Sequence, residues 1–75
     1  MKAVKFDESN CIYAENQEGY SPLPAHRNIN GVITTCWELS KDDLTELFKT
    51  NKVYVQIATF NEPLQPINLT IEKPV

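Results

Sequence analysis

The segment from residue 32 to residue 66, VITTCWELSKDDLTELFKTNKVYVQIATFNEPLQP, constrains the fold of this chain more than any other part. Residues 32 to 39 and 52 to 60 are rich in β-branched and aromatic side chains, which favour strands. A polar stretch with helical spacing lies between them, and Pro63 and Pro66 bracket a turn at the end. The segment therefore predicts a strand, a helix, a second strand and a turn.

Residues 40 to 50 are predicted to form the helix. Ser40 can cap its first turn, and Asp43 stands three residues later, where a capping-box partner lies. Asn51 can take the left-handed conformation that ends a helix. Three apolar residues at helical spacing form one narrow stripe: Leu44, Leu47 and Phe48. A stripe of this width predicts a helix that covers a sheet.

Strands are predicted on both sides of this helix. Residues 52 to 60 are apolar on both faces, and both faces need to be covered. The helix can cover one face, and a loop or a second subunit must cover the other. Residues 67 to 71 alternate between apolar and polar, which is typical of a half-exposed edge strand. In the N-terminal third, residues 4 to 6 and 12 to 14 are short candidate strands that could form a hairpin. Asn30-Gly31 predicts a tight turn before the strand at Val32.

Taken together, these patterns predict an α+β fold in one domain spanning residues 1 to 75. The expected architecture is an antiparallel sheet of four or five strands with one helix packed on it, in the order β-β-β-α-β-β. A chain of this length buries only about 60% of the surface that its unfolded form exposes. Association into a homo-oligomer is the expected source of additional stability.

The composition argues against several classes of protein. The start of the chain has no apolar run typical of a signal peptide, and no segment approaches the roughly 20 apolar residues of a membrane span, so a cytoplasmic location is expected. The net charge is -3 and the seven basic residues are scattered. General nucleic-acid binding, which needs several phosphate contacts, is therefore disfavoured. One or two cations could still hold a small anionic ligand.

No combination of residues predicts catalysis, a metal site or a cofactor. His26 has no zinc-ligand spacing to Cys11 or Cys36, and both thiols are expected to be free and reduced. Cys36 could act as a nucleophile, but its apolar surroundings favour a buried structural thiol. Asp42 and Asp43 resemble a carboxylate pair, yet adjacent helical positions point about 100° apart. We therefore expect a protein that is not an enzyme.

The best candidate for a binding surface is the stretch from Glu15 to Asn30. It is rich in Asn, Gln, Gly and Pro, and a loop of this length in a small domain is usually functional. Together with the turn after residue 62, it supplies four candidate residues for binding a ligand or partner: Tyr20, His26, Arg27 and Gln65. The alternative for the His-Arg pair is an ordinary solvated surface.

Three patterns of structural residues recur in a known group of proteins: Cys36-Trp37-x-Leu39-Ser40, then Val53-Tyr54-Val55 with Thr59-Phe60 after the helix, and Pro63-Leu64-Gln65-Pro66. In this order they resemble short proteins encoded by bacteriophages and prophages. The likeness runs from about residue 32 to residue 67. This chain differs in having Lys41-Asp42-Asp43 where more basic helix starts are common, and Asn51 where glycine is usual. A basic binding surface is therefore not expected.

The resemblance implies a setting rather than a mechanism. A short phage-type protein in the cytosol of a host cell is expected to act by stoichiometric binding. We expect a homo-oligomer that binds or sequesters a host protein or a small ligand and inhibits a host defence. The alternative is a structural or assembly protein of the virion.

Overall fold

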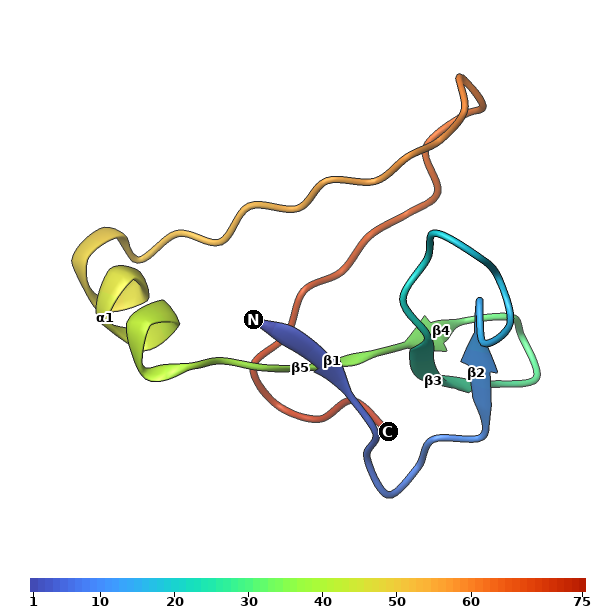
Figure 1. The fold of residues 1–75 in the computed structure, drawn as a ribbon, viewed down its shortest axis with the longest axis horizontal. Helices are drawn as coiled ribbons and strands as arrows, with labels where there is room; N and C mark the ends of the chain where they lie inside the picture. Colours follow the sequence, from blue (N-terminus) through green and yellow to red (C-terminus); the bar gives the residue numbers. More distant parts are fainter.

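The computed structural model describes residues 1 to 75 and contains five short strands followed by one helix (Figure 1). The bounds are β1 Lys2–Val4, β2 Cys11–Tyr13, β3 Leu23–Arg27, β4 Ile33–Thr34, β5 Cys36–Glu38 and α1 Lys41–Thr50. The predicted α+β class is confirmed. The predicted order β-β-β-α-β-β is wrong, because every strand precedes the helix.

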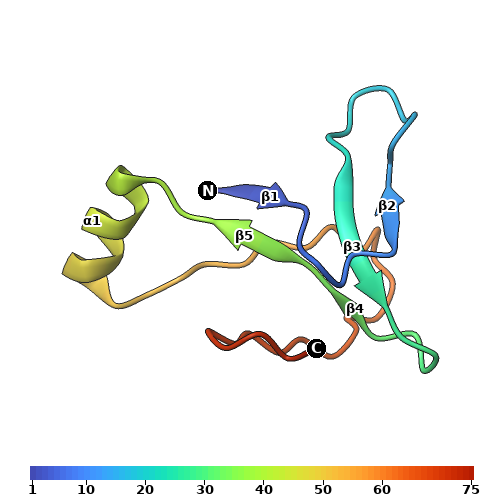
Figure 2. The same cartoon turned by 90° about the horizontal axis from the view of Figure 1, so that it is seen from below.

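The strands form two antiparallel sheets rather than the single sheet that we predicted. β1 pairs with β5, so that Ala3 lies opposite Trp37. β3 is the centre of the second sheet, with β2 on one side and β4 on the other. Figure 2 shows that β4 leads directly into β5, so one extended segment contributes to both sheets.

The predicted strand from residue 32 to residue 39 is split at Thr35. The Oγ1 atom of Thr35 accepts a hydrogen bond from the Nε1 of Trp37 at 2.9 Å. On one side of the break, β4 pairs with β3, and on the other side β5 pairs with β1. The change of partner ends one sheet and begins the other, so the two sheets are joined at this position.

The predicted hairpin between residues 4 to 6 and 12 to 14 does not form, because β1 and β2 belong to different sheets. A tight turn follows β1: the Ser9 N–H donates to the Phe6 carbonyl at 2.9 Å, and the Phe6 N–H donates to the Ser9 hydroxyl at 3.0 Å. The Phe6 N–H is thus used inside the turn and cannot extend a ladder with β2. The chain leaves β1 toward the three-stranded sheet instead.

β3 lies inside the stretch that we predicted to be a loop. Pro24 lacks the N–H that a central strand normally donates. The sheet is staggered, however: Pro24 faces Ile12 of β2, whereas β4 pairs only with His26 and Arg27. Because Pro24 has a strand on one side only, its missing donor breaks no ladder. Ala25, the next residue, is the one fully buried residue of the chain.

The helix forms as predicted at both ends. The Asp43 N–H donates to the Ser40 hydroxyl at 3.1 Å, and the Ser40 N–H donates to the Asp43 carboxylate at 2.9 Å, which completes the capping box. Asn51 ends the helix in the left-handed conformation at φ 56°, and its N–H donates to the Leu47 carbonyl at 2.7 Å. These contacts are local, which explains why the sequence predicted them.

The predicted packing of α1 on a sheet is wrong. Figure 2 shows α1 standing at one end of the molecule, away from both sheets. None of its residues is buried, and the side chains of Leu44 and Phe48 are 53% and 87% exposed. The strand that was expected to lie beneath the helix, residues 52 to 60, is not part of any sheet. The apolar stripe therefore has no sheet to cover within the single chain.

The C-terminal segment, residues 52 to 75, is extended but forms no strand. It makes one backbone–backbone hydrogen bond, from the Glu62 N–H to the Thr59 carbonyl at 3.0 Å. The strands predicted at residues 52 to 60 and 67 to 71 are therefore absent. The alternation of side chains that suggested the first of them is still present: Val55 is 50% exposed and Tyr54 is 84% exposed. A strand needs a neighbour, and the chain supplies none.

Asp43 makes the helix start sensitive to acid. The N-terminal ammonium group at 2.6 Å, followed by the Ser40 backbone and hydroxyl, lowers the pKa of Asp43 from 3.8 to about 2. Because the pKa is lowered in the folded state, the Asp43 carboxylate stabilises the fold fully above pH 3.8. This stabilisation disappears as the pH falls through about 2. We expect Asp43→Asn to melt below the wild type at neutral pH, and the gap to close near pH 2. Circular dichroism melts over this range measure it, and a gap independent of pH would contradict the capping role.

Candidate functional site

The stretch from Glu15 to Asn30 is not one continuous loop. β3 divides it, so Tyr20 lies in the turn before the strand and Arg27 at the end of the strand. A strand rises about 3.3 Å per residue, which separates the two ends of β3 by roughly 13 Å. The structure therefore does not bring Tyr20 together with His26 and Arg27 in one site.

Arg27 is presented on a firmly held backbone. Its N–H donates to the Asn10 side-chain oxygen at 2.9 Å, and its carbonyl accepts from the Asn10 side-chain nitrogen at 3.0 Å. The guanidinium takes part in neither of the two ion pairs of the molecule. Arg27 is exposed, so its charge is free to meet an anionic group from outside. Asn10, which directly precedes β2, is the residue that fixes this position.

His26 lies next to Arg27 but has a different environment. Successive residues of a strand point to opposite faces, so the two side chains diverge. His26 is half-buried, and its Nδ1 atom is buried without a hydrogen-bond partner. The pair does not form a joint clamp for a phosphate or a carboxylate. Of the two, Arg27 alone is placed to act at the surface.

The β3–β4 turn carries exposed apolar side chains that the sequence analysis did not single out. Ile29 is 99% exposed at this turn, and Val32 and Ile33 are also exposed. The side-chain oxygen of Asn28 accepts from the N–H groups of Asn30 and Val32, both at 2.9 Å. We call residues 27 to 33 the β3–β4 tip. Its signal in the sequence was Ile29 between asparagines, an apolar residue in an otherwise polar turn.

The predicted turn at Asn30-Gly31 is confirmed at this tip. The Gly31 N–H donates to the Asn28 carbonyl, and the Asn28 N–H donates to the Val32 carbonyl, both at 3.1 Å. Gly31 has φ 81°, a conformation that glycine adopts without the steric cost that a side chain brings. The tip is therefore held by backbone and asparagine hydrogen bonds before any partner arrives.

Gln65 lies elsewhere, in the C-terminal segment. It lines a hollow of about 360 Å³ formed only by residues 57 to 59 and 62 to 67. Phe60 and Asn61 make the bend between these two stretches with positive φ angles of 54° and 67°. The hollow includes none of the other predicted site residues. Gln65 is thus separate from the β3–β4 tip within one chain.

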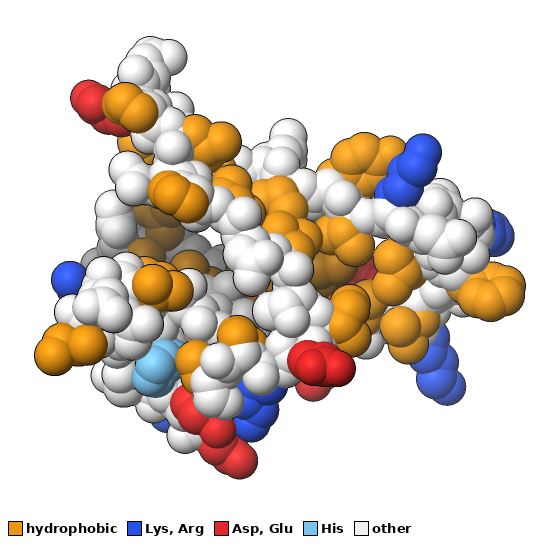
Figure 3. All heavy atoms as spheres, turned by 180° about the vertical axis from the view of Figure 1, so that it is seen from behind, with side chains coloured by type: hydrophobic (Ala, Val, Ile, Leu, Met, Phe, Trp, Pro, Cys, Tyr) orange, Lys and Arg blue, Asp and Glu red, His pale blue; other side chains and the backbone are white.

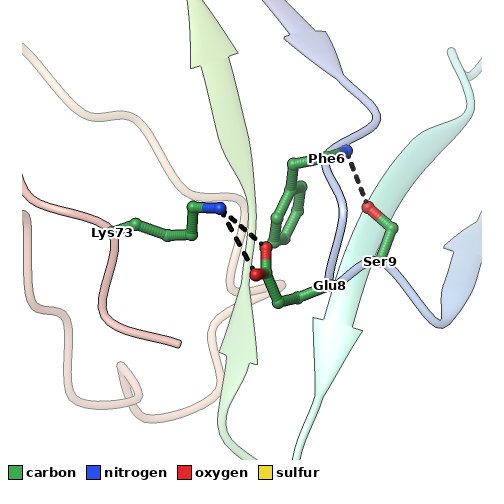
Figure 4. A network of polar contacts seen from close by, with 4 residues as sticks. All are labelled: Phe6, Glu8, Ser9 and Lys73. Atoms are coloured by element: carbon green, nitrogen blue, oxygen red, sulfur yellow. Dashed lines mark hydrogen bonds and ion pairs between the residues drawn. The ribbon is translucent and has the colours of Figure 1, made fainter.

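The end of the C-terminal segment returns to the strands through an ion pair. Figure 4 shows the Lys73 ammonium reaching the Glu8 carboxylate, and the two oxygens accept hydrogen bonds at 3.0 and 3.3 Å. The hydrogen bond from Lys73 lowers the pKa of Glu8, and the same contact raises the pKa of Lys73. Exposed pairs of this kind contribute little to stability. The ion pair holds Lys73 close to the turn after β1, and residues 52 to 67 take no part in it.

Both cysteines are free and half-buried. The thiol of Cys11 donates to the Ala25 carbonyl at 3.6 Å, and Cys36 lies on β5 opposite Val4. The structure contains no group of three or more His, Cys, Asp or Glu side chains placed to hold a metal ion. The one helix is too short and too polar to span a bilayer.

Comparison with known proteins adds no further assignment. No protein-family model, curated protein or solved structure matches this chain. The β3–β4 tip and the unpaired C-terminal segment are therefore the two features from which a function can be argued.

Proposed function

We propose that this chain is a small non-enzymatic binding protein that works as a homo-oligomer and binds a protein partner through the β3–β4 tip. The observation that carries the proposal is the unpaired Arg27 guanidinium beside the exposed side chains of Ile29 and Val32. Interfaces between proteins are enriched in arginine, and their buried centres are more apolar than the remaining surface. The tip combines both on a short hairpin.

The rigid backbone of the tip supports the same reading. The side chains of Asn10 and Asn28 hold the two ends of the turn through four hydrogen bonds of 2.9 to 3.0 Å. A loop that is ordered before binding loses less conformational entropy when the partner docks. The partner expected from this surface has an apolar recess for Ile29 and a carboxylate within reach of Arg27.

A protein partner is favoured over a small anionic ligand. Small-molecule sites are concave and enclose most of the ligand. The β3–β4 tip projects outward, with Ile29 99% exposed, and it contributes no residue to the hollow around Gln65. A projecting surface suits a recess on another protein.

The biological setting of the proposal comes from the phage-like sequence pattern of residues 32 to 67. The partner is then a protein of the host cytosol, and sequestering it inhibits a host defence. A stoichiometric inhibitor needs a stable surface rather than a catalytic centre. The small size of the chain suits this role.

Replacing Arg27 with alanine tests the proposal. We expect the melting temperature to change little, because exposed substitutions usually alter stability by less than about 0.5 kcal/mol. Binding of the partner is expected to weaken by roughly 1 to 3 kcal/mol, since a charge-assisted hydrogen bond is lost. Calorimetric titration against the partner recovered by cross-linking in host lysate measures both affinities.

Lys5→Ala is the matched control, because Lys5 is an exposed cation outside the tip and outside both ion pairs. It should bind like the wild type. If Arg27→Ala binds the partner as tightly as the wild type does, Arg27 is not part of the interface. If Ile29→Ser also binds the partner as tightly, the β3–β4 tip is not the interface.

A virion structural or assembly protein is the second candidate function. The extended segment at residues 52 to 75, with its unpaired backbone, favours it, because added strands also join neighbouring subunits in assemblies. Open assembly gives particles that grow with concentration, whereas an inhibitor forms a closed oligomer of fixed size. Light scattering over a concentration series distinguishes the two.

A further inference from the structure

The chain exposes far more surface than a compact protein of its mass. Its accessible area is 6993 Å², whereas a compact monomer of 8.6 kDa exposes roughly 4,700 Å². The Cα radius of gyration is 13.8 Å, against roughly 11 Å for a compact chain of this length. The excess, roughly 2,300 Å² per chain, is of the size that obligate interfaces bury.

The backbone also makes fewer hydrogen bonds than a compact chain of this length would make. The chain makes 24 backbone–backbone hydrogen bonds, about half of the roughly 50 expected for its length. Residues 52 to 58 make no backbone–backbone hydrogen bond, and neither do residues 63 to 75. An extended segment with free N–H and C=O groups is a template for pairing with another strand.

The side chains of this segment are apolar on both faces. Tyr54 is 84% exposed on one face, whereas Val53 and Ile57 are each about half exposed on the alternate face. Figure 3 shows hydrophobic side chains spread over one side of the molecule, with a recess open between them. Neither face of the segment is covered as a strand in a protein interior would be.

The length of the segment favours a second copy of the same segment as its partner. The strands of the chain are short: β3 has five residues, β1, β2 and β5 have three each, and β4 has two. None of these could pair with all of residues 53 to 59. The same segment in a second copy matches it residue for residue, and a two-fold axis makes such a pairing self-complementary.

We propose that residues 53 to 59, which end before the bend at Phe60, form an antiparallel strand pair with the same residues of a second copy of this chain. Pairing along the whole segment places the two-fold axis at Gln56, so Gln56 lies opposite its own mate. Val55 then lies opposite Ile57 of the second copy, a contact between β-branched side chains that stabilises sheets. The proposal rests on the homo-oligomer of the proposed function and identifies the surface that forms it.

Pairing of the two segments also gives α1 a sheet to cover. The helix is joined to the segment through residues 51 and 52 alone, and its stripe of Leu44, Leu47 and Phe48 covers no sheet in the single chain. A two-stranded sheet of paired segments offers an apolar face beside it. The arrangement predicted from the sequence, a helix on a sheet, would then be completed by two chains rather than by one.

Replacing Val55 with proline tests the pairing, because proline removes an N–H and breaks a strand ladder. The Val55 N–H makes no hydrogen bond within the chain, so the fold of one copy should remain. We expect the dissociation constant of the dimer, measured by sedimentation, to rise at least about 100-fold. Leu69→Pro is the control, since the Leu69 N–H is equally unpaired but lies outside the segment. The dissociation constant of its dimer should stay within about threefold of the wild-type value.

A second variant traps the register directly. Antiparallel neighbours have Cα atoms about 4.5 to 5.5 Å apart, which a disulfide can bridge. Gln56→Cys should therefore form a covalent dimer on mild oxidation, and peptide mapping should find the bridge between the two introduced thiols. Bridges only through the native cysteines would overturn the register.

Failure of this proposal is separable from failure of the proposed function. A dimer that dissociates equally for wild type and Val55→Pro, or a wild type that stays monomeric at about 100 μM, overturns the strand pairing. Loss of partner binding alone, with the Val55 result as expected, counts against the β3–β4 tip and leaves the pairing supported.

Discussion

Replacing Ala25 with aspartate is expected to unfold the three-stranded sheet. Ala25 is 0% exposed at the centre of β3, and its carbonyl accepts from the Asn10 N–H at 2.9 Å. A carboxylate at this fully buried position would be cut off from water. Burying an unpaired charge costs several kcal/mol, which is comparable with the whole stability of a small domain. Far-ultraviolet circular dichroism and amide chemical shifts measure the loss of structure.

Ile29→Asp is the matched control for this substitution. It introduces the same acidic side chain on the neighbouring turn, where the residue is 99% exposed. Its stability should stay within about 0.5 kcal/mol of the wild type. A folded, cooperatively melting Ala25→Asp would show that the centre of β3 is not the core of this chain.

Thermal stability is expected to rise with protein concentration. One fully buried residue leaves each chain with little core of its own, so association must supply much of the apolar burial. For a dimer that unfolds as it dissociates, each tenfold rise in concentration adds about 1.4 kcal/mol per mole of dimer. Between about 1 and about 100 μM the gain is about 2.8 kcal/mol. Melts over a dilution series measure it.

The variant Val55→Pro provides the control for the dilution series. If it prevents pairing of residues 53 to 59, the variant should melt below the wild type, and its melting temperature should no longer depend on concentration. A wild type whose melting temperature is constant over the same range, with the mass of a monomer by light scattering, would contradict stabilisation by association.

Among the candidate residues, Arg27 was selected for its charge, and the structure shows that it is exposed at the end of β3. Its charge suggested an anion contact, but its separation from His26 follows from β3, which the sequence did not reveal. Proline is unfavourable in a central strand, and only the stagger of the sheet makes Pro24 acceptable in β3. Had residues 23 to 27 been recognised as a strand, alternation would have predicted the opposite faces of His26 and Arg27.

Local chemistry accounts for what the sequence predicted well. The helix at residues 41 to 50 depends on Ser40, Asp43 and Asn51, each of which acts on groups within four residues of itself. The turn at residues 28 to 31 is likewise closed by Asn28 and Gly31. Such contacts are present whatever the remainder of the chain does, so sequence patterns are sufficient to find them.

Strand pairing was decided only in three dimensions. Alternation in residues 52 to 60 indicates an extended segment with two apolar faces, and the structure retains both properties. Whether that segment becomes a strand depends on a second backbone alongside it, from a distant part of the sequence or from another chain. The split between β4 and β5, the burial of Ala25 and the unpaired C-terminal segment all follow from that choice of neighbour, which is set by hydrogen bonds between distant residues.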